Sequence, residues 1–315
     1  MTTRSFDFPP VEEAESGQKL LQFLERRLGL PSNLIHRWIR TGQIRHNGKR
    51  CKPFERVATG DIVRLPPFAG QLAEQSRAEE PAPSELARNA PLPPLIGEKD
   101  GLLIFHKPAG LAVQPGTGIT DALSSRLAAH FAALPFKPVP CHRLDKDTSG
   151  AIIVAKTFEA LRRVQEQLSS GQIRKEYLAW TEGAWPYDGA VLLKHYLRKE
   201  AREDGSKIRV SNTPLPYAKE SRCVARPLRK EGDRTLLQIW LLTGRTHQIR
   251  AQLAACGHPV VGDGKYGKPG ILRLHAMRII FPDGDEFARA PDWEGAWSAE
   301  EIPPPIPALA AGENC

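Results

Sequence analysis

A run of polar and charged residues from His142 to Gly150 is the part of the chain best suited to chemistry. It reads His-Arg-Leu-Asp-Lys-Asp-Thr-Ser-Gly and places Asp145 between the cations Arg143 and Lys146. Neighbouring positive charge keeps a carboxylate ionised, and an ionised carboxylate can act as a nucleophile. From these residues alone, a surface ion pair worth under roughly 1 kcal/mol explains the run equally well.

Two further segments place polar groups beside strand-like hydrophobic residues, as a cleft at the edge of a sheet requires. They are Arg174-Lys175-Glu176-Tyr177 and Gly244-Arg245-Thr246-His247-Gln248-Ile249-Arg250. Taken alone, Tyr177 is typical of a core residue and Arg250 of a cation on a helix surface. Together with the Asp145 run, the two segments are candidates for one shared site.

Hydrophobic periodicity predicts the elements that position these segments. The expected strands are Leu102–His106, Ala151–Ala155, Lys175–Thr181, Ala218–Arg226, Leu236–Leu242 and Leu272–Phe281, and the expected helices are Ala122–Leu134, Phe158–Leu168 and Thr246–Cys256. Consecutive strands with short polar joins favour an α+β fold, with a mixed, largely antiparallel sheet and flanking helices. The spacing Gly262-x-Gly264-x-x-Gly267 formally matches a dinucleotide-binding fingerprint. Pro269 follows where that motif needs a helix to begin, so these glycines are interpreted as turn residues.

The positive charge of the chain is concentrated near its N-terminus. The 315 residues carry 44 Lys and Arg against 36 Asp and Glu, and residues 16–66 alone hold 11 basic and 3 acidic side chains, so the remainder is balanced at 33 of each. A concentrated basic patch is the usual electrostatic footprint of a nucleic-acid partner, although a solvated charged face gives the same composition.

The N-terminal segment reads as a small α/β unit. Leucines at helical spacing from Leu20 to Leu28 and a second apolar stripe from Leu34 to Ile39 predict two helices, and Asn47-Gly48 predicts a β-hairpin. Another strand is expected at 60–65. This arrangement gathers five cations that can meet RNA phosphates: Arg37, Arg40, Arg45, Lys49 and Arg50.

We expect four regions: an RNA-binding module at 16–66, a flexible linker at 67–94, a catalytic domain at 95–290 and a loosely held tail at 291–315. The linker contains six prolines between 67 and 94 and no apolar periodicity. Five scattered cysteines without a Cys-x-x-Cys pair predict reduced thiols in a cytoplasmic protein. No apolar run approaches the roughly 18 residues that a membrane span requires, and no signal peptide is apparent, so no membrane association is expected.

The motifs in the larger domain resemble those of RluA-type RNA pseudouridine synthases, and they occur in the same order and at the same spacing as in that family. The matching segments are His142-Arg143-Leu144-Asp145 with Thr148-Ser149-Gly150, Arg174-Lys175-Glu176-Tyr177, Gly244-Arg245-Thr246-His247-Gln248-Ile249-Arg250, and Gly257-His258-Pro259-Val260-Val261-Gly262-Asp263. The N-terminal segment resembles the RNA-binding module of the ribosomal protein S-four type. Together they have the layout of the family's ribosomal RNA enzymes.

The resemblance implies an isomerase that converts specific uridines to pseudouridine in structured RNA. It assigns the nucleophile to Asp145, its ion-pair partner to Arg250, stacking on the target base to Tyr177, and filling of the space left by the flipped uridine to Arg143. His142 and His247 are expected to fix loop geometry by hydrogen bonding. The reaction adds no group and changes no oxidation state, so no cofactor and no metal are expected.

Other interpretations stay open at this point. Asp145 and Asp147 could be the acid and nucleophile of a glycoside or nucleoside hydrolase. Four residues could form a metal phosphodiesterase site, although none has a tight ligand spacing: His142, Asp145, His247 and His258. A non-enzymatic RNA-binding or ribosome-assembly factor is the alternative outside catalysis. Within the family, large-subunit ribosomal RNA is the expected substrate, transfer RNA is the alternative, and a monomer is expected.

Overall fold

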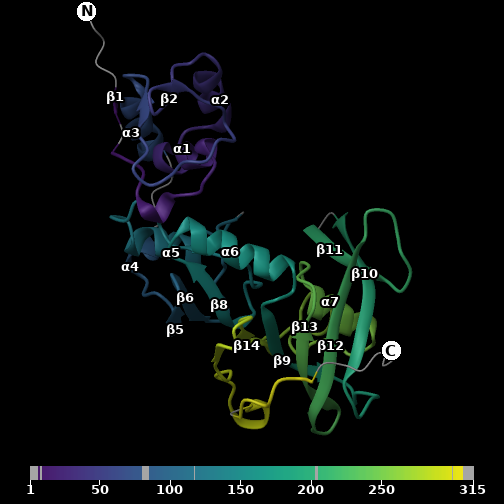
Figure 1. Cartoon of the computed structure of the whole chain (residues 1–315). Coiled ribbons are helices and arrows are strands. Elements are labelled where there is room, and N and C mark those ends of the chain that lie inside the picture. The colour runs from purple at the N-terminus through teal and green to yellow at the C-terminus, as the bar shows by residue number, and fades with distance from the viewer. Residues whose placement is uncertain are drawn as a thin grey trace, which may run out of the picture.

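The computed structural model describes residues 6–7, 9–79, 85–116, 118–202, 205–299 and 301–307. They form a four-stranded sheet near the N-terminus and an eleven-stranded sheet in the remainder. Figure 1 shows the small N-terminal unit at one end of the molecule, beside helices of the larger unit. The described residues thus form two units, each with its own sheet.

The N-terminal unit packs helices on short strands around its own core. Its elements are β1 (Phe6–Asp7), η1 (Glu13–Glu15), α1 (Leu20–Leu28), α2 (Ser32–Arg40), β2 (Arg45–His46), β3 (Lys49–Arg50), β4 (Val63–Leu65) and α3 (Ala69–Glu79). The strands lie in the order β1-β4-β2-β3. The core includes Phe23, Trp38 and Ile44, all nearly inaccessible to solvent. Both expected helices are therefore confirmed.

The turn between β2 and β3 forms as its Asn-Gly pair predicts. Asn47 and Gly48 have φ angles of 48° and 77°, the two left-handed conformations that a type I′ hairpin turn requires. The Asn47 side chain also reaches the segment before β4, where it donates to Asp61 (2.8 Å) and accepts from the Ile62 N–H (2.8 Å). The hairpin is confirmed, and these bonds fix it to the neighbouring strand.

The segment 67–94 contains regular structure, so the expectation of a flexible linker is wrong for its described residues. α3 and α4 (Glu85–Asn89) occupy much of it, whereas 80–84 lie outside the described part of the chain. Ala69 and Ala73 are buried in the N-terminal core. A helix that buries mainly alanines shows little apolar periodicity in its sequence, and its stability comes from tertiary packing.

The larger unit is built on one mixed sheet. Its elements are β5 (Leu95–Lys99), β6 (Leu102–Lys107), α5 (Leu123–His130), β7 (Val139–Pro140), β8 (Ser149–Ala155), α6 (Phe158–Ser169), β9 (Arg174–Glu182), β10 (Val191–Arg202), β11 (Gly205–Ser211), β12 (Lys219–Lys230), β13 (Arg234–Leu241), α7 (Gln248–Ala255), β14 (Leu274–Ile280), β15 (Glu286–Ala288) and η2 (Gly295–Trp297). The strand order is β11-β10-β12-β13-β9-β14-β8-β6-β5, with β15 beside β14 and β7 beside β8. The expected α+β fold is confirmed, and the β10–β11 hairpin is an addition that the sequence did not indicate.

One pair of neighbouring strands in this sheet is parallel. β14 runs parallel to β8 and antiparallel to β9, so it lies between two strands that only α6 separates in the sequence. Gly150 makes the close approach possible. Its φ is +116°, and a Cβ there would lie 2.2 Å from the carbonyl oxygen of Ala276. Glycine is required at this position because any side chain would push β8 and β14 apart.

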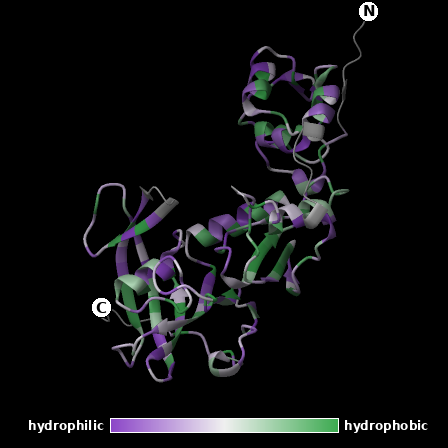
Figure 2. Ribbon diagram, turned by 180° about the vertical axis from the view of Figure 1, so that it is seen from behind, coloured by the Kyte–Doolittle hydropathy of each residue, from purple (hydrophilic) through white to green (hydrophobic). Residues whose placement is uncertain are grey.

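Hydrophobic layers cover both faces of the sheet. One cluster joins α5 and α7 to the strands through residues such as Leu127, Leu253 and Val154, and another packs α6 against Ile104 and Ile153. Strands covered on both faces are hydrophobic along their whole length, and Figure 2 shows this for β6 and β8. Among the described residues, no helix combines the length and apolar character needed to cross a membrane.

The C-terminal segment packs against the sheet, so the expectation of a loosely held tail is wrong for its described residues up to 307. Ile306 is fully buried, and its N–H donates a 3.0 Å hydrogen bond to the Glu176 carboxylate. The carbonyls of Pro303 and Pro304 accept from Arg278 (2.6 Å) and Gln238 (3.0 Å). Polar partners on the sheet hold this proline-rich segment, and hydrophobic periodicity gives no signal for such contacts. Residues 308–315 lie outside the described part.

The glycines at 262, 264 and 267 lie in turns, as expected from the proline that follows them. Gly262 has a φ of +78°, and a Cβ there would lie 2.1 Å from the carbonyl oxygen of Ile271. The helix nearest in sequence, α7, ends at Ala255, before this run begins. The rejection of a dinucleotide-binding motif is therefore confirmed.

Candidate active site

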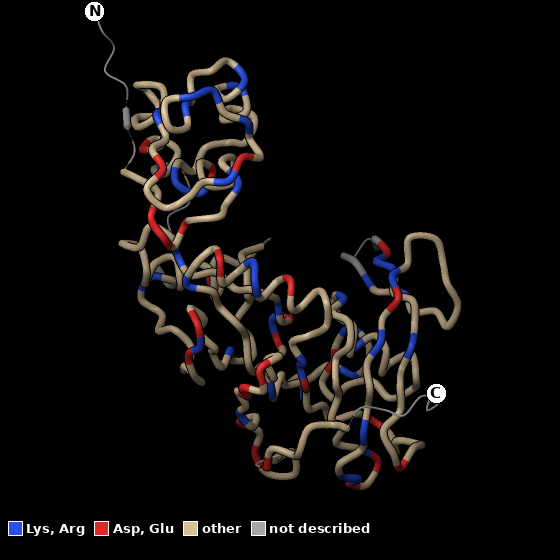
Figure 3. The backbone as a smooth tube through the Cα atoms, viewed as in Figure 1, with Lys and Arg blue, Asp and Glu red and all other residues tan. Residues whose placement is uncertain are grey.

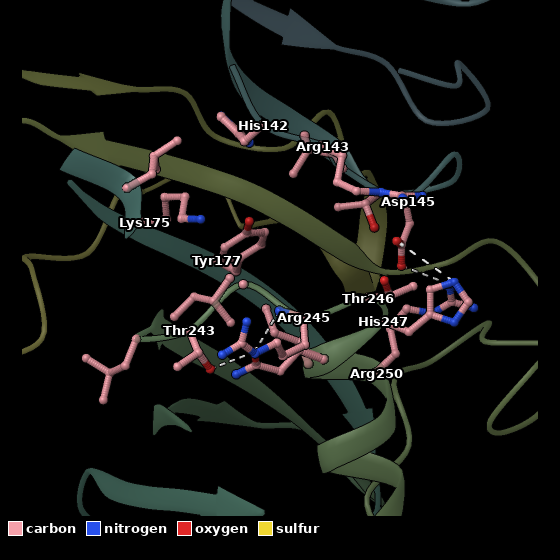
Figure 4. Close-up of a pocket in the computed structure, with 18 of the residues that line it drawn as sticks. His142, Arg143, Asp145, Lys175, Tyr177, Thr243, Arg245, Thr246, His247 and Arg250 are labelled. Carbon is pink, nitrogen blue, oxygen red and sulfur yellow. Dashed lines mark hydrogen bonds and ion pairs between the residues drawn. The ribbon is translucent and has the colours of Figure 1, made fainter. Parts of the chain in front are cut away.

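All three predicted motif segments line one cavity of about 500 Å³ in the larger unit. Asp145 enters it from the loop before β8, Tyr177 from β9, and Arg250 from the first turn of α7 (Figure 4). The end of α6 closes one side with Leu168. Segments more than 100 residues apart thus supply the walls of a single pocket.

A chain of three charged side chains lies at one side of this cavity. Arg250 Nη1 donates a 3.0 Å hydrogen bond to Asp145 Oδ2. On its other side, Arg250 binds Asp263 through two bonds, Nε to Oδ2 at 2.7 Å and Nη2 to Oδ1 at 2.8 Å. The bidentate pair fixes the guanidinium plane, so Nη1 points at Asp145. Asp145 therefore has a defined orientation although it belongs to a loop.

The electrostatics of this chain favour its charged form. Burial alone would lower the pKa of Arg250, but the bonds and charges of Asp263 and Asp145 outweigh burial and raise it. Burial alone would raise the pKa of Asp263, but the Arg250 bonds and the N–H groups of Lys265 and Tyr266 lower it. A buried cation with two anionic partners meets the need for compensation of buried charge.

The start of α7 is shaped so that Arg250 reaches the cavity. His247 caps the helix in a left-handed conformation with a φ of 52°, and its Nδ1 lies 3.0 Å from the Tyr266 hydroxyl. The Gln248 side chain accepts from the Arg245 N–H (3.0 Å) and from the Thr243 hydroxyl (2.8 Å). These bonds satisfy polar groups at the helix N-terminus and hold the loop before it.

A buried lysine holds the loop that carries Asp145. Lys107 Nζ donates to three backbone carbonyls, those of Pro108 (2.9 Å), Leu111 (2.8 Å) and Lys146 (3.0 Å). Burial lowers its pKa to about 8, against the opposing charges of Asp147 and Asp145. The ammonium therefore joins the end of β6 to the residue directly after Asp145.

Tyr177 lies against the cavity with its ring in the hydrophobic core. Its side chain is only 5% exposed, and alternation along β9 puts Lys175 and Tyr177 on one face and Glu176 on the other. Burial, and then the negative charge of Asp145, raise the pKa of the Tyr177 hydroxyl. The phenol thus stays protonated and presents an aromatic face to whatever fills the pocket.

The remaining residues of the 142–147 run differ in their exposure. Arg143 lines the cavity but is exposed, whereas Asp147 is exposed and is not among the lining residues. His142 Nε2 accepts a 3.1 Å bond from the Ile153 N–H, and burial lowers the pKa of this histidine to about 3. The expected hydrogen-bonding role of His142 is observed. Asp147 does not face the pocket as the second carboxylate of a hydrolase would.

The pocket residues also bear on the metal phosphodiesterase interpretation. His247 Nε2 lies 4.0 Å from Asp145 Oδ1, while His258 binds the Glu182 carbonyl through Nδ1 at 3.1 Å. Nowhere in the described ranges do three or more His, Cys, Asp or Glu side chains form a group suited to a metal ion. The geometry gives this interpretation no support.

The five basic residues predicted for RNA binding lie on α2 and the β2–β3 hairpin. Arg45 on β2 pairs with Arg50 on β3 and with Arg64 on β4. A Cβ on Gly42 would lie 3.3 Å from Arg50 Nε, so the hairpin approaches the end of α2, which carries Arg37 and Arg40. Figure 3 shows blue segments gathered on this part of the N-terminal unit. The predicted cluster is therefore present as a surface.

Three residues of the site had no role in the sequence-based interpretation: Lys107, Lys175 and Asp263. Asp263 ends a recognised motif, and the only hint of its role is that a buried arginine requires an anionic partner. Lys107 occurs at the end of an apolar strand run, where a lysine is unexpected unless its ammonium has partners. The pattern could therefore have singled out Lys107, but its partners are backbone carbonyls that no pattern reveals.

Comparisons with known proteins agree with this geometry. Residues 101–255 match the family model described as RNA pseudouridylate synthase. The chain is 36% identical to ribosomal large subunit pseudouridine synthase C of Haemophilus influenzae over 288 residues, 86% of this chain and 85% of that protein. It is 36% identical to the Escherichia coli K12 protein of the same name over 271 residues, 84% and 81% of the two chains. The solved structure of human RNA Pseudouridylate Synthase Domain Containing 1 is 26% identical with a TM-score of 0.51, covering 63% of this chain and 82% of that chain.

The chain therefore belongs to the RluA-type RNA pseudouridine synthases. Such a protein is an isomerase that converts uridine in RNA to pseudouridine. Because the family and the enzyme class are now established, the hydrolase and phosphodiesterase alternatives are set aside.

Proposed function

We propose that this protein modifies uridine in large-subunit ribosomal RNA, with Asp145 as the nucleophile. The observation that carries the catalytic assignment is the Asp145–Arg250 pair, because Asp145 lines the 500 Å³ cavity and Arg250 binds and orients its carboxylate. A carboxylate held in this way can attack either the base or the sugar of a nucleotide in the pocket.

Isomerisation requires three operations, and each pocket residue contributes to them in a different way. The N1–C1′ bond must break, the uracil must turn, and C5 must bond to C1′ while a proton leaves C5 and another is gained at N1. Asp145 supplies the nucleophile, Arg250 fixes it, and the buried Tyr177 ring holds the base while it is detached. An unpaired base stacks well on an aromatic face.

Arg143 lies where it can replace the uridine in the RNA. It is adjacent to the pocket yet exposed, so its guanidinium can stack in the space that the flipped nucleotide leaves. Flipping costs a few kcal/mol in lost stacking, and a planar cation in the vacated space recovers part of it.

The choice of large-subunit ribosomal RNA is supported by two observations. Several curated relatives are named ribosomal large subunit pseudouridine synthase C, and their similarity extends over more than four fifths of both chains. The N-terminal unit presents a basic surface suited to structured RNA, as a module of the S-four type would. We propose that this module extends beyond residue 66, because α3 completes its core, and that the protein acts as a cytoplasmic monomer.

Mapping of pseudouridine in all cellular RNA, with and without this protein, tests the proposal. We expect the loss of one or a few pseudouridines in large-subunit ribosomal RNA, restored by the wild-type gene but not by Asp145→Asn. Loss of transfer RNA sites alone would replace the proposed substrate with the alternative one. An unchanged map, together with an effect on ribosome assembly that Asp145→Asn rescues, would favour the non-enzymatic factor.

A further inference from the structure

Lys175 is a cation in the cavity without a partner. It lines the pocket beside Tyr177 and is partly buried, and a Cβ built on Gly244 would lie 3.6 Å from its Nζ. Within the described ranges its side chain makes no hydrogen bond or ion pair, whereas its neighbour Arg174 is paired with Glu176. Figure 4 shows the ammonium directed into the pocket rather than out to solvent.

An ammonium in this position is costly for the folded protein. Burial lowers the pKa of Lys175 to about 8, and no nearby carboxylate opposes that effect. Natural proteins seldom retain an unpaired cation in a pocket unless a ligand supplies the compensating charge. The ligand of this pocket should therefore present an acceptor or a negative charge at Lys175.

The direction of Lys175 within the site identifies which part of the ligand it meets. Lys175 and Tyr177 project from the same face of β9, about 7 Å apart along the strand. In Figure 4, Asp145 lies on the opposite side of the Tyr177 ring from Lys175. A uracil on Tyr177 with its N1 and C6 edge near Asp145 turns its opposite edge, which carries O4, toward the Lys175 ammonium.

We propose that Lys175 donates a hydrogen bond to O4 of the target uracil and stabilises the negative charge that O4 gains during the reaction. This inference deepens the proposed function and rests on it. Lys175 would then be a catalytic residue, because it contacts the reacting base.

The charge on O4 arises whichever carbon Asp145 attacks. If a carboxylate oxygen bonds to C6, the C5=C6 electron pair moves toward C4 and the C4=O4 pair becomes an enolate. If the N1–C1′ bond breaks first, its electron pair stays on the uracil and is delocalised over N1, O2 and O4. In both routes Lys175 keeps its proton. A fixed donor aimed at developing charge in a pocket sheltered from water accelerates such steps.

The same contact distinguishes uracil from cytosine. Cytosine carries an amino group where uracil carries O4, and that amino group is a donor. Two donors facing each other in a sheltered site leave both unpaired, which is strongly unfavourable. A lysine at this edge therefore adds base selectivity to catalysis.

The test compares three variants with the wild-type enzyme on a ribosomal RNA fragment that carries the mapped uridine. Lys175→Met removes the charge but keeps the length of the side chain, and Lys175→Arg keeps the charge. Arg37→Met, in the N-terminal unit, shows for comparison the effect of losing a cation proposed to bind an RNA phosphate. Single-turnover rates at saturating RNA, dissociation constants and their salt dependence are measured for each, with thermal melting to confirm folding. We expect Lys175→Met to lower the rate about 100-fold, with RNA affinity within about twofold of wild type and an unchanged salt dependence. Lys175→Arg should recover part of that rate.

Substrates with one sulfur atom locate the contact on the base. Sulfur accepts hydrogen bonds poorly, so the wild-type enzyme should convert a substrate with sulfur in place of O4 at a different rate from uridine. In Lys175→Met, the same replacement should change the logarithm of the rate by at most half as much. Replacing O2 should affect both proteins equally. Equal 4-thiouridine effects in both proteins, a wild-type rate in Lys175→Met, or a loss confined to affinity with a reduced salt dependence would overturn the proposal. Product formed by the wild-type enzyme reports on the proposed function itself, so the two failures are distinguishable.

Discussion

The pocket and the N-terminal basic surface use positive charge in opposite ways. Arg250 in the pocket makes three hydrogen bonds to two carboxylates, and Lys107, which supports the loop that carries Asp145, makes three to carbonyl groups. On the N-terminal surface, five cations make no side-chain hydrogen bond or ion pair to any other described residue: Arg37, Arg40, Arg45, Lys49 and Arg50. Paired charge fixes a geometry for chemistry, and unpaired charge is free to meet phosphates.

This difference separates what each region contributes to the reaction. A substitution in the pocket should change rates and stability with little effect on RNA affinity. A substitution on the N-terminal surface should change affinity and its salt dependence with little effect on the rate at saturating RNA. Lys175 departs from this division, because it lies within the pocket but makes no side-chain hydrogen bond or ion pair to another described residue.

Asp145→Asn should have the largest effect. The asparagine keeps the size of the side chain and can still accept from Arg250, but it cannot act as a nucleophile, so product formation should fall by more than about 10³-fold. The rate is measured in a single turnover, by release of tritium from C5 of the target uridine. RNA affinity should stay within about twofold of wild type. Activity close to wild type would contradict the assignment of the nucleophile.

Arg250→Met should destabilise the larger unit. It leaves the buried Asp263 carboxylate and Asp145 without their cation, which costs about 3–5 kcal/mol of unfolding free energy. Urea unfolding followed by tryptophan fluorescence measures this loss. Arg37→Met, which removes an exposed unpaired cation of the same type, should change stability by no more than about 0.5 kcal/mol. Equal losses in the two variants would remove the contrast between the regions.

Neutralising two cations of the N-terminal surface should weaken RNA binding. Arg37→Gln with Arg40→Gln should lower affinity about tenfold and reduce the slope of log affinity against log salt by about 2. Filter binding over a range of salt measures both quantities, and Lys268→Gln, at an exposed lysine of the larger unit, is the matched control. These substitutions are preferable to deletion of residues 1–66, because the deletion would expose the face of α3 that packs on the module core. An unchanged slope would show that this surface is only a solvated face.

Acid should destabilise the larger unit by a smaller amount. Burial lowers the pKa of His142 to about 3 and of His275 to about 4, from 6.5 in an unfolded chain. Between these values the unfolded state binds more protons, so stability falls as the pH drops below 6.5. Each histidine should contribute a loss of about 2 kcal/mol between pH 7 and pH 5. Urea unfolding at pH 7, 6 and 5 measures the loss, and His275→Gln should remove its share. A variant with the wild-type pH dependence would contradict this origin.

Much of the fold could be predicted because it depends on local signals. Strands such as β8 are continuous apolar runs, and Asn47-Gly48 has the backbone conformation that its turn requires. The β10–β11 hairpin could not be predicted, since its outer part is rich in charged residues such as Arg198 and Lys199 and lacks apolar alternation. Its stability comes from pairing with β12, the next strand, and from contact with α7, which is more distant in sequence.

The site was partly predictable for the same reason. Recognisable sequence motifs contain Asp145, Tyr177 and Arg250, and the structure brings all three residues to one cavity. Lys107 and Asp263 act through partners that only the folded chain brings near, a set of carbonyls for one and a guanidinium for the other. Sequence motifs identify groups that touch a substrate more readily than groups that position them.

The location of β14 has a consequence for synthesis of the protein. β14 lies between β8 and β9, although it leaves the ribosome after both of them and more than 90 residues later than β9. A nascent chain that ends before residue 274 contains the whole N-terminal unit, which is the proposed RNA-binding module, but its β8 and β9 have no strand to join them. The enzyme should therefore acquire RNA affinity before it acquires a working pocket, and synthesis must have passed β14 before the first uridine is converted.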